Sequence, residues 1–83
     1  MIDITLAYRY TYREEPRSML VQYLDGAVSV TDHNGDLHSL TYDAEGATLT
    51  GPGQLADTHR RAIAGLLATA IAQVEATLAW ATP

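Results

Sequence analysis

The three histidines are the side chains in this sequence that titrate near neutral pH, so they are the first candidates for acid–base chemistry. A histidine that acts as a general base needs a partner and a pocket. No two of them stand four residues apart, as two metal ligands on one helix face would, and no Gly-x-Ser-x-Gly sequence supplies a nucleophile. We therefore expect His38 at the rim of the core, His33 and His59 in solvent, and no enzymatic role.

Two short segments have the composition of ligand-binding loops. Residues 32–36 carry oxygen ligands at alternate positions, but the glycine and glutamate that complete a calcium loop are replaced by Leu37 and Asp43. Residues 51–53, Gly-Pro-Gly, precede a helix and could present N–H groups to an anion, yet their spacing matches neither phosphate-binding fingerprint. Turn chemistry explains both segments, so the sequence predicts no metal and no cofactor.

Tyrosines are five of the six aromatic residues, and three of them alternate at Tyr8, Tyr10 and Tyr12. Aromatic rings on an open sheet can stack on bases, but a helix is expected to cover this face. The tyrosines then form the rim of the core, with their hydroxyls in water. Tyr10 and Tyr12, near Arg13 and Arg17 at the end of a strand, are the candidates for an aromatic protein-binding patch.

Alternation of apolar and polar residues predicts an antiparallel sheet. Pro16 is expected to interrupt it, because proline cannot donate to a strand ladder. Asp25-Gly26 favours a two-residue hairpin turn, which places Val21 opposite Val30. The predicted strands cover residues 2–12, 18–24, 27–32, 36–43 and 47–50.

The turn before residue 36 decides which side chains share a face. A two-residue Asn34-Gly35 loop would send Leu40 to the face away from Val28. A three-residue loop, His33 to Gly35 with glycine in the left-handed conformation, places Val28 opposite Leu40. A slip of one residue moves every side chain to the other face, so we choose the three-residue loop. The result is a meander with one apolar and one polar face.

Residues 54–80 are expected to form one long helix that covers the apolar face, giving a two-layer α+β fold in a single domain, residues 1–83. Residues 62–81 have the length of a membrane span, but alanine contributes little to insertion and Glu75 is charged, so we expect no membrane contact. The predicted core stripe recurs every three or four positions: Ile63, Leu66, Leu67, Ala70, Ile71, Val74 and Leu78.

The back of this helix is made of small residues, whereas an exposed helix face usually carries charges. Small residues four positions apart allow two helices to approach closely. The simplest partner is a second copy in a twofold homodimer, with Trp80 as an anchor near the end. The predicted self-association surface consists of Ala64, Ala68, Ala72, Ala76 and Trp80.

Charge is unevenly distributed along the chain. Ten acidic residues stand against five arginines and no lysine, for a net charge of −5. A nucleic-acid binder needs the opposite, a basic footprint, so no direct contact with nucleic acid is expected. The meander gathers acidic residues without compensation at one end of the sheet, where they would attract a basic protein partner. These residues are Asp3, Asp25, Asp43 and Glu45.

Together these features predict a small, non-enzymatic protein-binding domain that blocks a basic partner, one that handles nucleic acid. The absence of cysteine and of a signal-peptide pattern points to the cytoplasm. In size and charge the chain is similar to phage anti-CRISPR and other anti-defence inhibitors and to immunity proteins, a likeness of gross character without a shared motif. The alternatives are a self-associating structural or adaptor subunit, and a small enzyme or ligand carrier that uses His38, His59 and the tyrosine rim.

Overall fold

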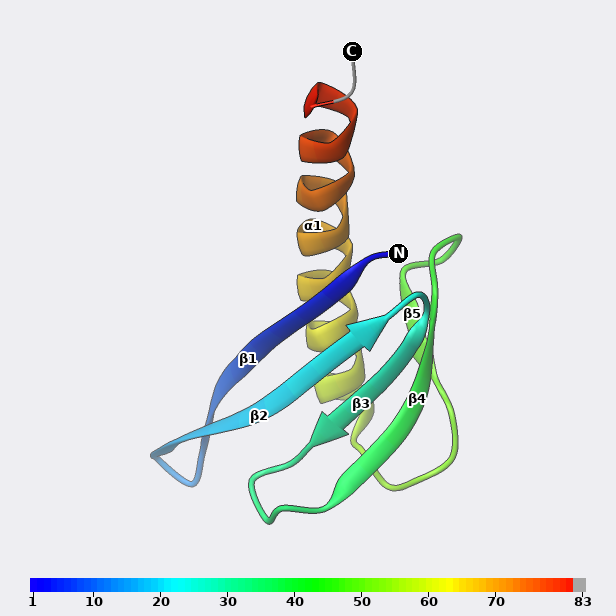
Figure 1. The fold of residues 1–83 in the computed structure, drawn as a ribbon. Coiled ribbons are helices and arrows are strands. Elements are labelled where there is room, and N and C mark those ends of the chain that lie inside the picture. The colour runs from blue at the N-terminus through cyan, green and yellow to red at the C-terminus, as the bar shows by residue number, and fades with distance from the viewer. Residues whose placement is uncertain (82–83) are drawn as a thin grey trace.

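The computed structural model describes residues 1–81 of the 83-residue chain as five strands followed by one helix (Figure 1). Each strand pairs antiparallel with the next one in the chain, and the helix packs on one face of the curved sheet. The predicted five-stranded meander with one covering helix is confirmed. The elements are β1 (Asp3–Tyr12), β2 (Glu15–Leu24), β3 (Ala27–Thr31), β4 (Leu37–Asp43), β5 (Thr48–Thr50) and α1 (Asp57–Ala81).

Two turns fix the register of the meander. Asp25 and Gly26 have φ angles of 45° and 97°, as a two-residue hairpin turn requires, and Val21 pairs with Val30 across it. Gly35 has a φ angle of 87° and closes the three-residue turn between β3 and β4. That turn pairs residue 28 with residue 40. The predicted pairing is therefore correct on both sides of β3.

β2 begins at Glu15, three residues earlier than the sequence predicts. Arg13 and Glu14 have φ angles of 50° and 64° and form a second two-residue turn. Tyr12 pairs with Glu15 directly across this turn. The chain thus reverses at once, where the sequence predicted an interruption of the sheet.

Pro16 is compatible with β2 because of where β3 ends. Residues that flank a two-residue hairpin turn exchange both hydrogen bonds, so the next pair, Thr11 and Pro16, is a non-hydrogen-bonded one. The nitrogen of Pro16 then faces away from β1, and β3 pairs only with residues 20–24 of β2. No ladder needs the missing N–H. Residues 8–19 therefore project beyond β3 as a two-stranded ribbon (Figure 1).

The core lies between the helix-side face of the sheet and the first half of α1. Its four most deeply buried side chains are Val21 and Val30, at the centre of the sheet, and Ile63 and Leu67, on the helix. Burying a side chain of this size contributes roughly 1.5–3 kcal/mol relative to exposure. The position of α1 on the sheet therefore depends on these two helix residues.

The face that α1 turns to the sheet differs from the predicted stripe. Ala64, predicted on the helix back, is 2% exposed and belongs to the core, whereas Leu66, predicted in the core, is 42% exposed. The helix packs chiefly against β5 and β1. Ala64 lies beside Leu49 of β5, where its short side chain lets the helix approach. The helix also begins at Asp57 rather than residue 54, and the Arg60 N–H donates to the carbonyl of Ala56 at 3.0 Å.

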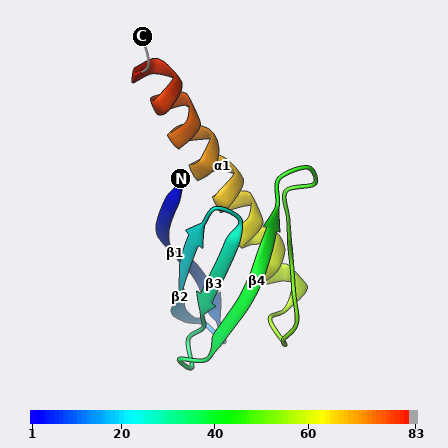
Figure 2. The same ribbon diagram turned by 45° about the vertical axis from the view of Figure 1, so that its right-hand side comes forward.

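The end of α1 extends past the sheet (Figures 1 and 2). Residues 75–80 are exposed, and Trp80 is 90% exposed. By length and composition the segment Asp57–Trp80 could cross a membrane. Of the most apolar 18-residue stretch of this segment, 17% is buried in the protein. The buried share comes from the first half of the helix, so the uncovered apolar surface is concentrated at the projecting end.

Candidate functional site

The fold separates the charged side chains toward two ends of the molecule. The start of β1, the β2–β3 turn and the β4–β5 turn lie at one end of the sheet, and the last turns of α1 pass the same end (Figure 1). All five arginines lie away from it, on the ribbon and on the first turn of α1. We call this end the acidic end and define it by five carboxylates: Asp3, Asp25, Asp43, Glu45 and Glu75.

The four acidic residues predicted from the sequence are all exposed at this end. Two of them also form turns. The Asp25 carboxylate accepts the Ile2 N–H at 3.0 Å, and the Asp43 carboxylate accepts the Glu45 N–H at 3.0 Å. Asp3 and Glu45 are consequently the residues whose charge can be altered with least effect on the backbone.

Glu75 joins the acidic end from the helix and was not predicted there. The sequence carried a signal, because residues 68, 72 and 75 recur at helical spacing, but the rotation of α1 was needed to bring them to this side. Together with the β4–β5 turn they line a hollow of about 500 Å³. The rings of Tyr23 and Tyr42, with centroids 6.0 Å apart and planes at 81°, form part of its wall. Of the described residues that line this acidic-end hollow, Glu75 is the charged one.

A second cluster, which we call the Tyr–His cluster, lies at the opposite end and comprises Tyr8, Tyr10, Tyr12, His33 and His59. The Tyr8 hydroxyl is hydrogen-bonded to Nδ1 of His59 at 3.0 Å, and the Tyr10 hydroxyl to Nδ1 of His33 at 2.6 Å. The rings of Tyr8 and Tyr10 stack with centroids 5.2 Å apart, and the His59 ring lies 4.6 Å from that of Tyr10. His33 is exposed, as predicted, but the sequence did not predict that it binds the hydroxyl of Tyr10 or that the half-buried His59 binds the hydroxyl of Tyr8.

Burial raises the pKa of Tyr10 above its ordinary value, and the nearby Arg17 guanidinium acts in the opposite direction. Tyr12, the other residue of the predicted aromatic patch, is 41% exposed, and the Arg13 guanidinium lies 5.2 Å from its ring centroid. The two tyrosines thus belong to one cluster but differ in role. Tyr10 packs within it, and Tyr12 forms its outer surface.

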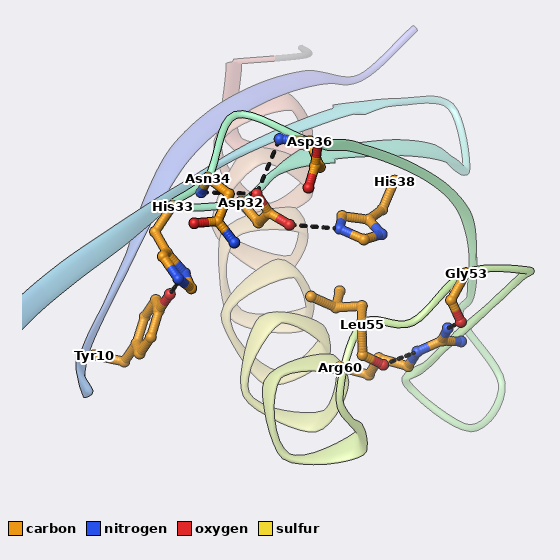
Figure 3. Close-up of polar contacts among 9 residues, drawn as sticks. All are labelled: Tyr10, Asp32, His33, Asn34, Asp36, His38, Gly53, Leu55 and Arg60. Carbon is orange, nitrogen blue, oxygen red and sulfur yellow. Dashed lines mark hydrogen bonds and ion pairs between the residues drawn. The ribbon is translucent and has the colours of Figure 1, made fainter. Parts of the chain in front are cut away.

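Asp32 organises the turn between β3 and β4 (Figure 3). Its Oδ1 accepts the N–H groups of Asn34 and Asp36, both at 2.9 Å, and its Oδ2 accepts the Nε2–H of His38 at 2.9 Å. The side chains of Asp32 and His38 are only 13% and 14% exposed. The hydrogen bond from His38 holds the pKa of Asp32 below its usual range, and the two backbone N–H groups lower it further.

Each histidine joins two elements of the fold. His59 connects α1 to β1, His33 connects the β3–β4 turn to β1, and His38 connects β4 to the end of β3. One ring nitrogen of each is therefore engaged by a protein partner. Within residues 1–81, no three His, Asp or Glu side chains are placed to hold a metal ion. The hydrogen bonds of His59 and His33 hold β1 against the start of α1 and against the β3–β4 turn.

The loop before α1 presents carbonyl oxygens, not N–H groups, to a charged side chain. The Arg60 guanidinium donates to the carbonyl oxygens of Gly53 and Leu55 at 3.3 and 2.9 Å (Figure 3). It also donates to the carbonyl oxygen of Gly51 at 3.0 Å. A loop whose oxygens converge on a guanidinium stabilises a cation. The anion-binding alternative for Gly-Pro-Gly therefore has no support from the geometry.

Comparison with protein-family models, curated protein sequences and solved structures finds no significant match for this chain. Function must be inferred from the residues and their arrangement. The structure offers two surfaces for that inference, the acidic end with its hollow and the projecting end of α1.

Asp32→Asn should lower the free energy of unfolding at pH 7 by about 1–2 kcal/mol, because a charged acceptor of the His38 hydrogen bond is lost. A carboxylate whose pKa is lowered on folding stabilises the protein above its unfolded-state pKa and loses this contribution as the pH falls through its folded-state pKa. The difference between wild type and variant should therefore shrink between about pH 5 and pH 2. Urea denaturation over this range measures it.

Asp36→Asn is the matched control, because Asp36 contributes its backbone to the same turn. It should change stability by less than about 0.5 kcal/mol. A pH-independent deficit in Asp32→Asn, or an equal deficit in Asp36→Asn, would show that the Asp32–His38 contact does not stabilise this turn.

Proposed function

We propose that this protein is a small, non-enzymatic binding domain of the cytoplasm that inhibits a basic, nucleic-acid-handling protein by occupying its positively charged surface. The observation that carries the proposal is the uncompensated charge of the acidic end. Five carboxylates gather there, while the Arg17–Glu15 ion pair and the Asp32–His38 contact lie at the opposite end. Such a separation of charge steers a basic partner to one side of the molecule.

The construction of the acidic end supports a protein partner. Its carboxylates project from two hairpin turns, a strand start and a helix, all anchored on one packed core. Because the backbone of these elements is already ordered, binding costs only the ordering of the exposed side chains. The similarity in size and net charge to phage anti-CRISPR and immunity proteins supports the inhibitory role in the same general way.

A double charge reversal tests the proposal. The partner is first recovered on the immobilised protein and eluted with salt. Asp3→Arg with Glu45→Arg should then reduce the affinity for this partner about tenfold or more, because attraction becomes repulsion. The logarithmic slope of affinity against salt concentration should also become shallower. Titration calorimetry at several salt concentrations measures both.

The matched control is Glu14→Arg with Asp36→Arg, which changes the net charge equally at the other end of the sheet. This variant should retain its affinity within about threefold, since only long-range steering is altered. Equal losses in the two variants would show that net charge matters and the acidic end does not. Unchanged affinity in both would contradict the proposal.

The projecting end of α1 favours self-association as the alternative function, that of a structural or adaptor subunit. The predicted surface needs correction, since Ala64 is in the core and Ala68 is partly buried beside the hollow. Ala72, Ala76 and Trp80 remain exposed. They would form the centre of a helix–helix contact in a twofold dimer.

Ala76→Glu tests this alternative by placing a charge in the centre of such a contact. A dimer formed through α1 should become monomeric in sedimentation equilibrium, because a buried, unpaired carboxylate is strongly unfavourable. Thr41→Glu, an exposed change on β4, is the control of equal charge and should stay dimeric. A wild-type protein that is monomeric at every concentration, or a dimer that survives Ala76→Glu, would exclude it.

A further inference from the structure

The acidic-end hollow combines three features that bear on what it can bind. Its inner wall is apolar, formed by Ile2 and Ile71. Two tyrosine rings, those of Tyr23 and Tyr42, stand beside this wall. Glu75 contributes a carboxylate. The hollow therefore combines half-buried apolar side chains with an exposed carboxylate.

We infer that this hollow is the pocket for an arginine side chain of the basic partner, an inference that rests on the proposed function. The three methylene groups of arginine match the apolar wall. Its planar guanidinium can stack on a tyrosine ring and pair with a carboxylate at the same time. Aromatic rings and buried arginines are the residue types that dominate binding energy at protein interfaces.

The surroundings of the hollow favour a cation over a neutral or anionic occupant. Ala44, which lines the hollow, lies between Asp43 and Glu45 in the β4–β5 turn, so two more negative charges belong to this turn although neither side chain lines the hollow. All five arginines of the chain itself lie away from this end. The site thus provides a negative potential that no cationic side chain of this protein neutralises, and a phosphate or a membrane of anionic lipids would be repelled.

Arginine rather than lysine follows from the half-buried ring of Tyr42, which stands edge-to-face against the ring of the core residue Tyr23. Lysine carries a compact, strongly hydrated ammonium group, whereas the guanidinium is flat and weakly hydrated and keeps its hydrogen bonds in one plane while its face contacts a ring. A hollow with one carboxylate and two tyrosines uses both properties. We therefore expect the pocket to discriminate between these two cations of equal charge.

The test uses two peptides of equal charge, hexa-arginine and hexa-lysine, titrated into the isotope-labelled full chain and followed by nuclear magnetic resonance. Hexa-arginine should bind saturably, more tightly than hexa-lysine, and shift the ring resonances of Tyr23 and Tyr42. Glu75→Gln should weaken its binding about fivefold or more by removing the carboxylate. Ala72→Leu should do the same by filling the hollow without changing the charge.

Asp3→Asn is the matched control for Glu75→Gln. It removes one charge from the same end, but residue 3 alternates with the buried Ile4 and so lies on the face of the sheet away from α1. It should weaken the binding of both peptides by the same factor, and by less than Glu75→Gln does, since it lowers the potential of the acidic end without removing a group that lines the hollow. Glu75 and Ala72 are both exposed, so their replacement leaves the core intact.

Two results would overturn the pocket and tell its failure from that of the proposed function. If Glu75→Gln and Asp3→Asn weaken binding equally and Ala72→Leu has no effect, the acidic end attracts cations but contains no arginine pocket. If the two peptides bind equally well, the hollow is not an arginine pocket. If they shift only the resonances of the Tyr–His cluster, the pocket is absent and the acidic end is not the binding surface either.

Discussion

In an antiparallel meander, alternate turns lie at the same end of the sheet, and this constraint places most of the net negative charge of the molecule at one end. The β2–β3 and β4–β5 turns share one end with the start of β1. Turns favour aspartate for local reasons, since its carboxylate accepts nearby backbone N–H groups, as Asp43 does here. Asp25 instead accepts the N–H of Ile2, 23 positions away, and the absence of arginine from this end has no local explanation.

The covering helix gives this end its shape. The side chains of Ile63 and Leu67 fix α1 against the sheet, and Ala64 lets it approach β5. The resulting rotation carries Glu75 and Ala72 to the side of the β4–β5 turn. A hollow with two tyrosines and a carboxylate is thus a consequence of core packing about two turns earlier in the helix. Charge from the turns and shape from the helix together make the acidic end a candidate binding surface.

The fold could be predicted because its signals are local. Asp25-Gly26 and the turn ending in Gly35 determine which residues pair, and the alternation of side chains then defines the apolar face. The interruption predicted at Pro16 was wrong because its compatibility with β2 depends on where β3 ends, which no property of residues 14–17 reveals. The position of Ala64 was missed for a related reason. The core stripe was predicted from large apolar side chains, and the close approach of α1 to β5, which requires a small side chain, could not be known from the sequence.

The candidate sites also divide into residues whose positions follow from local signals and residues whose positions depend on distant parts of the chain. The four acidic residues followed from topology, but the Tyr–His cluster did not. The Tyr8–His59 hydrogen bond joins residues 51 positions apart, and nothing in the spacing of either residue indicates the other. The row of alternating tyrosines was the available signal for the ribbon. The partners of these tyrosines, His59 and His33, could not be predicted, because their positions depend on where the helix start and the β3–β4 turn lie.

Hydrogen exchange of the complex tests the central claim, that the acidic end is the surface that binds the partner. Amide exchange would be compared between the free protein and the protein bound to its recovered partner. The account predicts slower exchange in the β2–β3 turn, the β4–β5 turn and the part of α1 around Glu75. Slower exchange confined to the ribbon or to the end of α1, with both turns unchanged, would contradict it.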